Sequence, residues 1–141
     1  MTEQEKQKLE QIMRQTVSNN MYMQFLGIEL LALEEGYAKG RMKFNRSICN
    51  PYEMIHGGSL YSFADTVAGT AACMAGRYVT TVSGTMNFLL PANNTEYVYC
   101  EAKALRQGNH MAVFAVRITD DNETLIDSGE FTFYKMDKLL L

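Results

Sequence analysis

The segment from Gly57 to Ala75 constrains the fold of this chain more than any other part of the sequence. Its apolar residues recur at the i, i+3, i+4, i+7 spacing of one helix face. Many of the other residues are Gly or Ala, which allow neighbouring backbone to approach closely. We therefore predict a long, buried helix that needs a large apolar surface to cover it. The apolar face consists of Leu60, Phe63, Ala64, Val67, Ala68 and Ala71.

Six runs with the composition of β-strands flank this helix. Two precede it, over residues 26–33 and 37–45, and the Glu34-Glu35-Gly36 turn between them indicates a hairpin. A loop over residues 46–55, which contains Pro51, leads into the helix. Four further runs follow, and the turn-forming residues between them indicate an antiparallel meander. These four runs span residues 78–90, 96–105, 111–119 and 124–135.

The N-terminal segment predicts an additional helix. Residues 2–18 carry Leu9, Ile12, Met13 and Val17 at helical spacing, and Thr2 with Glu5 matches a capping box. A single sheet in this chain has one obvious partner for its apolar face, the central helix. We predict an α+β fold in one domain over residues 1–141: a single antiparallel sheet of about six strands wrapped round the long central helix, with an N-terminal helix within residues 1–20.

The composition excludes several classes of function. A net charge of −3 leaves no basic surface for nucleic acid, so we expect no nucleic-acid partner. The three cysteines are odd in number and form no C-x-x-C pair, which argues against both a disulfide framework and a metal site. The polar N-terminus and the absence of any uncharged apolar run of roughly 20 residues argue against secretion and membrane insertion. We expect a cytoplasmic protein.

Asp65 is the only carboxylate between Gly57 and Gly76. On a helical wheel it lies about 130° from the centre of the apolar stripe. A carboxylate on a buried helix is costly unless it is hydrogen-bonded or functional. Two interpretations stand at this point: a structural group at the wet edge of the helix, and a general base or nucleophile at an interface.

Gly57 and Gly58 follow His56 where the loop meets the helix. Free backbone N–H groups there carry the positive end of the helix dipole, and glycine lets a ligand come close to them. A carbonyl against the Gly57 N–H would have its developing oxyanion stabilised. Gly57 and Asp65 are separated by about 12 Å of helix. That is too far for both to act on one carbon, so we predict a two-fold dimer in which Asp65 of one subunit faces Gly57 of the other.

Two segments together resemble a known family. Asn50, His56-Gly57-Gly58 and Asp65, at their spacing, are similar to the PaaI-like hotdog thioesterases. The run from Val82 to Ala92, with its F-L-x-P-A ending, resembles the central strand of that family. The resemblance covers about residues 20–136. It implies the hotdog fold, hydrolysis of acyl-CoA thioesters, no separate cofactor because CoA is part of the substrate, and a homodimer with shared active sites within a homotetramer.

The resemblance also implies roles for five residues. Gly57 would supply the backbone oxyanion donor, and Asp65 would be the nucleophile or the base that activates water. Asn50 would orient the carbonyl or the attacking water. His56 would hold the loop or the thioester end, and Thr81 stands where relatives carry a residue that steadies the water.

Five further residues are expected to contact the substrate. Gly58 and Tyr61 lie on the central helix, and Ser83 lies on the following strand, where many relatives carry an acidic residue. Arg106 and Asn109 lie near a predicted hairpin tip and are candidates for contact with the CoA phosphates. The alternative for Arg106 and Asn109 is simple solvation, since basic residues at turns are usually exposed.

The predicted function is therefore acyl-CoA hydrolysis, and two alternatives remain. One is a hotdog protein that binds acyl-CoA or another hydrophobic ligand without turnover. The other is a hotdog enoyl-CoA hydratase, which would need a catalytic His paired with an acid; the sequence offers His56 but no Asp-x4-His pairing.

Overall fold

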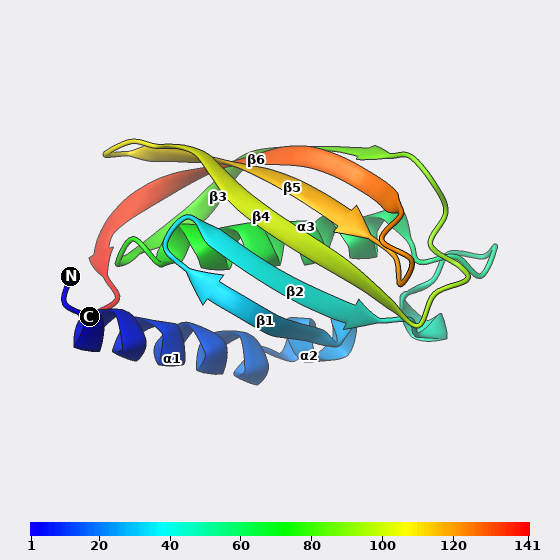
Figure 1. The fold of residues 1–141 in the computed structure, drawn as a ribbon, viewed down its shortest axis with the longest axis horizontal. Coiled ribbons are helices and arrows are strands. Elements are labelled where there is room, and N and C mark those ends of the chain that lie inside the picture. The colour runs from blue at the N-terminus through cyan, green and yellow to red at the C-terminus, as the bar shows by residue number, and fades with distance from the viewer.

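The computed structural model describes all 141 residues of the chain. Its central helix, α3 (Gly57–Cys73), lies against one face of a six-stranded antiparallel sheet that curves around it (Figure 1). The predicted apolar face of α3 is buried, and Gly40 on the sheet shows how close the two layers come. A Cβ atom on Gly40 would lie 2.9 Å from Cγ2 of Val67 and 3.2 Å from the Glu29 carbonyl oxygen, so any larger residue would push the helix or the sheet aside. The predicted α+β class and the sheet wrapped round a central helix are confirmed.

The six strands are joined only by antiparallel pairings, in the spatial order β1-β2-β4-β5-β6-β3. The first two form the predicted hairpin, and the turn between them contains Gly36 with a φ of 78°. The strands are β1 (Ile28–Glu34), β2 (Tyr37–Lys43), β3 (Arg77–Phe88), β4 (Tyr97–Gln107), β5 (Met111–Thr119) and β6 (Leu125–Leu139).

The predicted meander is wrong for its first strand. β4, β5 and β6 are consecutive neighbours, but β3 pairs with β6 and forms an edge of the sheet. The segment over residues 89–96 is not a tight hairpin turn. Its Leu89 and Leu90 N–H groups donate to the Ile126 carbonyl, and Ala92 is buried and accepts from the Ile55 N–H. These contacts carry the chain away from β3 and past β6 and β5 to the start of β4.

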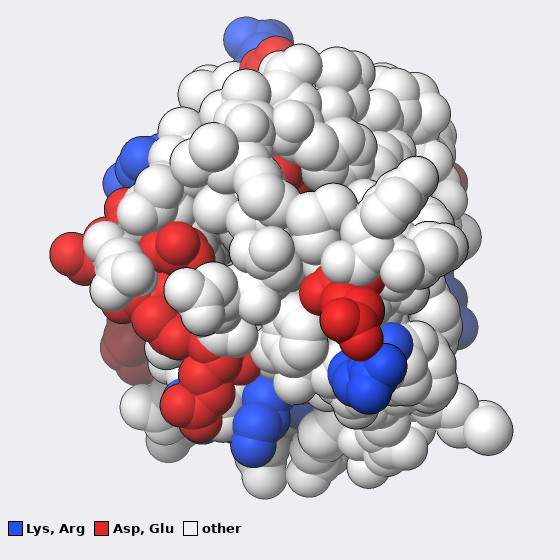
Figure 2. Space-filling model, turned by 90° about the vertical axis from the view of Figure 1, so that its right-hand side faces the viewer, with Lys and Arg blue, Asp and Glu red and all other residues white.

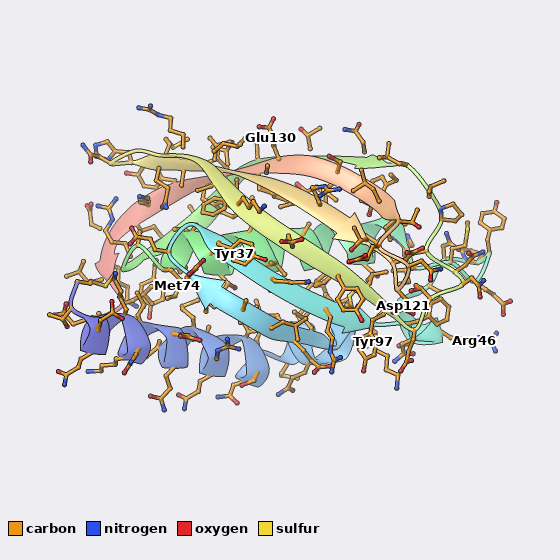
Figure 3. All side chains as sticks on the ribbon, viewed as in Figure 1. Tyr37, Arg46, Met74, Tyr97, Asp121 and Glu130 are labelled. Carbon is orange, nitrogen blue, oxygen red and sulfur yellow. The ribbon has the colours of Figure 1, made fainter.

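The β5–β6 turn is tied to the start of β4 (Figure 3). The carboxylate of Asp121 accepts hydrogen bonds from the backbone N–H groups of Glu96, at 2.5 Å, and Tyr97, at 3.3 Å. Because these are charge-assisted bonds, they hold the pKa of Asp121 below its ordinary value.

Two helices precede the sheet. The predicted N-terminal helix is confirmed as α1 (Glu3–Asn19), with the capping box of Thr2 and Glu5 in place and Leu9, Met13 and Val17 buried. A short helix, α2 (Met21–Leu26), was not predicted. The Asn20 side chain caps it, and Gly27 ends it with a φ of 76°, so the first strand starts at Ile28 rather than at residue 26. None of the helices is both long and apolar enough to cross a membrane.

Asp127 on β6 is an exception in an otherwise apolar core. Its side chain is fully buried, and neither carboxylate oxygen has a hydrogen-bond partner. Strand alternation places it on the same face as Phe131 and Phe133, both buried in the core. Burial raises the pKa of Asp127 to about 7.

We expect Asp127 to make the protein less stable as the pH rises. The unfolded chain loses this proton near pH 3.8 and the folded chain near pH 7, so rising pH between these values favours the unfolded state. Asp127→Asn removes the ionisation. Between about pH 4 and about pH 8, the unfolding free energy of the variant relative to wild type should rise by up to about 4 kcal/mol, measured by urea titration.

Asp121→Asn is the matched control for this measurement. The pKa of Asp121 lies below its ordinary value of 3.8, so its contribution to stability is complete once the unfolded chain has lost the proton, above about pH 5. The difference between Asp121→Asn and wild type should therefore stay constant from about pH 5 to about pH 8, where most of the change at Asp127 occurs. A constant difference for Asp127→Asn as well would contradict the assignment of a buried, titrating Asp127.

Candidate active site

The first turn of α3 is organised by His56. It is the N-cap residue, and its Nδ1 atom accepts a hydrogen bond from the Gly58 N–H at 2.7 Å. Its own N–H donates to the Ile48 carbonyl at 3.0 Å, which joins the helix to the preceding loop. Both hydrogen bonds join the loop to the helix, as the expected loop-holding role requires, and the contact of His56 with a thioester stays a prediction. Because the Gly58 N–H donates to His56, this N–H is not free to bind the substrate, although Gly58 was expected to contact it.

One backbone donor of this turn remains free. The N–H groups of Ser59 and Leu60 donate to the His56 carbonyl, whereas the Gly57 N–H has no acceptor. Gly57 also lines a pocket, so its backbone lies next to the space that a ligand would occupy. An unpaired N–H at a helix N-terminus is suited to stabilising developing negative charge.

The pocket has a volume of about 400 Å³ and lies between the first turn of α3, the loop before it and the end of β3. That volume is within the range of small-ligand sites, which runs from about 300 to 1,000 Å³. The lining is mostly apolar. It consists of Asn50, Met54, Ile55, Gly57, Leu60, Phe88, Leu89, Leu90, Pro91, Ala92 and Asp127.

The surface around this end of the molecule is mostly uncharged. Figure 2 looks onto the end that holds the loop before α3: its largest group of Asp and Glu lies on the left, and its Lys and Arg side chains lie apart from one another near the rim. Arg46, in the short 3-10 helix η1 (Arg46–Ile48), is one cation at this end (Figure 3) and pairs with Glu53 at 2.8 Å. The pocket is therefore better suited to an uncharged group than to phosphates.

Asn50 lines the pocket, but the oxygen of its side-chain amide already accepts two hydrogen bonds from the loop. Its Oδ1 atom accepts hydrogen bonds from the N–H groups of Tyr52, at 2.9 Å, and Met54, at 3.2 Å. These bonds shape the loop before α3 in the manner of an Asx turn. Only the Nδ2 group of Asn50 is left to contact a ligand.

Asp65 lies outside this pocket and next to β3. The Thr81 hydroxyl donates to its Oδ1 atom at 2.8 Å, so two of the predicted catalytic residues are in contact. Burial raises the pKa of Asp65, and the hydrogen bond from Thr81 opposes that rise. A raised pKa brings a carboxylate closer to the range of a general base. Within one chain, Asp65 and Gly57 stay about two turns apart on α3.

Tyr61 and Ser83 have different surroundings. The Tyr61 hydroxyl donates to the Gly84 carbonyl on β3 at 3.3 Å, and its ring packs edge-on against Phe131, so it supports the sheet. A Cβ atom on Gly84 would collide with both Phe131 and the Tyr61 hydroxyl, which explains the glycine there. The Ser83 side chain is exposed on β3.

Arg106 and Asn109 are not brought to the Gly57 pocket. The β4–β5 turn that carries them lies at the opposite end of the molecule from the loop before α3 (Figure 1). Arg106 is exposed opposite Val113, and the Asn109 carbonyl accepts a hydrogen bond from Arg77 at 2.5 Å. Contact between these residues and a ligand in the pocket would require a second copy of the chain.

The structure adds Asp127 to the pocket, a residue that sequence analysis missed. The available signal was strand alternation, which places Asp127 and Gly129 on the side of Phe131 and Phe133. Nothing in that pattern says that an aspartate on this side lines the same pocket as Gly57. No cluster of three or more His, Cys, Asp or Glu side chains has an arrangement that could hold a metal ion.

Comparison with known proteins identifies the family. The family model described as the thioesterase superfamily matches residues 52–126. The acyl-coenzyme A thioesterase PaaI of Escherichia coli is 26% identical over 108 residues, 77% of each chain. The solved structure of the E. coli PaaI protein, from the phenylacetic acid degradation operon, superposes with a TM-score of 0.89 at 22% identity, covering 95% of this chain and 97% of that one.

A second solved structure, of a thioesterase family protein from Silicibacter pomeroyi, is also similar over most of the chain. It superposes with a TM-score of 0.83 at 23% identity, covering 91% of this chain and 98% of that one. The predicted hotdog fold and the predicted resemblance to PaaI-like proteins are thus confirmed. The chain belongs to the thioesterase superfamily and is a thioester hydrolase.

Proposed function

We propose that this protein hydrolyses acyl-CoA thioesters to the free acid and CoA. The observation that carries the proposal is the unpaired N–H of Gly57. It lies at the N-terminus of α3, the positive end of the helix dipole, and Gly57 lines a largely apolar pocket. The name of the E. coli relative, an acyl-coenzyme A thioesterase, supports acyl-CoA as the substrate class. The acyl group would enter the pocket, and its carbonyl oxygen would accept a hydrogen bond from Gly57.

Asp65 would start the reaction. As a base, its carboxylate takes a proton from water while the water oxygen bonds to the carbonyl carbon. The negative charge that develops on the carbonyl oxygen is held by the Gly57 N–H and the dipole of α3. Collapse of this intermediate breaks the carbon–sulfur bond, and the CoA thiolate leaves and takes up a proton. As a nucleophile, Asp65 would instead bond to the carbonyl carbon and displace the CoA thiolate, which forms an anhydride. Water would then hydrolyse the anhydride, release the acid and restore the Asp65 carboxylate.

The separation of Gly57 and Asp65 calls for a shared site. β3 supports a dimer because it is a sheet edge whose outer backbone groups have no strand partner, and none of its residues is buried. Exposed apolar side chains lie along it and just beyond, among them Val82 (53% exposed), Phe88 and Leu89. Long, apolar strand edges are normally covered. We propose that two β3 edges meet and bring Asp65 of one subunit to Gly57 of the other; the expected homotetramer stays a prediction.

The two alternative functions have less support. The Nδ1 atom of His56 is engaged in capping α3, which leaves it poorly placed as the catalytic acid of a hydratase. A binding protein without turnover needs neither a free oxyanion donor nor a carboxylate with a raised pKa next to a hydroxyl donor.

Asp65→Asn should abolish hydrolysis. The amide has nearly the same shape but cannot take a proton or attack the carbonyl, so kcat should fall at least about 100-fold. Thiol release from a panel of acyl-CoA esters is followed with a chromogenic thiol reagent. Binding of a non-hydrolysable thioether analogue, measured by calorimetry, should persist in the variant. Full activity in Asp65→Asn would remove Asp65 from the mechanism.

Gly57→Pro tests the oxyanion donor. Proline lacks the N–H, and since this N–H has no acceptor in the fold, no structural hydrogen bond is lost. The first helical position tolerates proline, and His56 already has the extended backbone that precedes it, with φ −60° and ψ 137°. We expect kcat to fall at least about 100-fold.

Gly57→Ala is the control for the donor test. It retains the N–H, and its Cβ would lie 3.5 Å from the Phe88 ring, an ordinary contact. The alanine variant should keep much more activity than the proline variant. Equal losses in the two variants would point to the shape of the pocket rather than to the donor.

Mixing Asp65→Asn with Gly57→Pro tests whether the site is shared. In a mixed dimer, one site would combine the two intact residues and the other would combine both defects. Random pairing after co-refolding should therefore restore about a quarter of wild-type activity from two inactive proteins. A mixture that forms mixed dimers, as shown by differently tagged chains, yet stays inactive would place both residues in a site within one chain.

A further inference from the structure

Asp127 is the one ionisable side chain that lines the pocket, and the proposed mechanism does not use it. Its side chain lines the pocket and is fully buried, and both oxygens lack a hydrogen-bond partner. β-Pairing sets it between Phe88 on β3 and Ile118 on β5. An unpartnered carboxylate in such surroundings costs stability, and buried polar groups are nearly always paired in native structures.

The fold itself gives no reason for a carboxylate here. Phe131 and Phe133 hold equivalent inward positions on the same strand and pack in the apolar core. An apolar residue at position 127 would extend that core and cause no desolvation penalty. The cost of Asp127 therefore points to a partner that is present only when the pocket is filled.

The pocket lining does not supply that partner. It contains no Lys or Arg, and Asn50 is its only other polar side chain. The Oδ1 atom of Asn50 is engaged by the loop, and its amide makes no bond to Asp127. A hydrogen-bond donor must then come from the occupant.

We propose that Asp127 is a specificity-determining residue that accepts a hydrogen bond from a hydroxyl group on the acyl part of the substrate. The proposal rests on the proposed function, which places the acyl group in this pocket. A hydroxyl fits better than an ammonium group, because removing a full charge from water into an apolar pocket is far more costly. A carboxylate or phosphate on the ligand would be repelled by Asp127.

The test compares thioesters that differ by one hydroxyl group. Benzoyl-CoA is compared with its meta-hydroxy and para-hydroxy derivatives, and hexanoyl-CoA with its terminal-hydroxy derivative. Sites that hydrogen-bond a substrate hydroxyl reject analogues that lack it. Wild type should therefore show kcat/KM at least about tenfold higher for a hydroxylated member of one pair. In Asp127→Leu, which has a similar shape and no acceptor, this ratio should fall to about one.

Two further variants support the comparison. Ser128→Ala changes the neighbouring residue on the opposite face of β6, which does not line the pocket, and should keep the wild-type ratio. Asp127→Asn serves if the leucine variant does not fold. Its amide oxygen is a neutral and therefore weaker acceptor. The ratio of kcat/KM values should then lie between that of wild type and the value of about one that indicates no preference.

The outcomes separate this inference from the proposed function. Hydrolysis of every thioester without any hydroxyl preference in wild type overturns the role of Asp127 and leaves the thioesterase intact. An equal loss on all thioesters in Asp127→Leu overturns it too, because Asp127 would then bind the common CoA part. If no thioester is hydrolysed, the proposed function fails, and the hydroxyl preference is decided by calorimetric binding of the matching thioether analogues.

Discussion

The burial of α3 against six strands is the interaction on which the remaining structure depends. Its contact face is built of Leu60, Phe63, Val67 and several alanines, and glycine at position 40 on β2 lets the backbone come close. Burial of this face contributes roughly 25 cal/mol for each Å² of apolar surface removed from water. Because α3 spans the sheet, its two ends and its exposed edge are held at fixed places. A loop-borne site would lack that rigidity.

The rigid helix also keeps the two candidate catalytic groups, the Gly57 N–H and the Asp65 carboxylate, apart. The free Gly57 N–H is available only at the first turn, where helix geometry leaves N–H groups without intrahelical acceptors. Asp65 avoids the deepest part of the core by facing β3, where Thr81 donates to it. Neither residue can move toward the other without unwinding α3. In the proposed mechanism, a second subunit rather than a local rearrangement would therefore complete the site.

Sequence patterns predicted the elements well, and long-range pairing less well. The period of α3, the capping box of α1 and the β1–β2 hairpin are local properties, and all three are present. The place of β3 depends on which strand pairs with it, and the 89–96 segment gives no local sign that it passes β6 and β5. The short helix α2 depends on a cap from Asn20 and a stop at Gly27, two residues that are equally common in loops.

The residues of the candidate site also differ in whether local sequence patterns or long-range strand pairing place them. Gly57, His56 and Asp65 are predictable because the start of α3 and the register of its faces follow from the sequence, whereas Asp127 becomes visible only when β6 is placed against β3. Its position has an electrostatic consequence. An ionised Asp127 and the oxyanion held by Gly57 would occupy one pocket of low dielectric, where like charges repel strongly. A hydroxyl donor on the acyl group would draw charge density from the carboxylate and weaken that repulsion as the oxyanion forms. The substrate that satisfies Asp127 would therefore gain in kcat as well as in binding, which ties the choice of acyl group to the chemistry at Gly57.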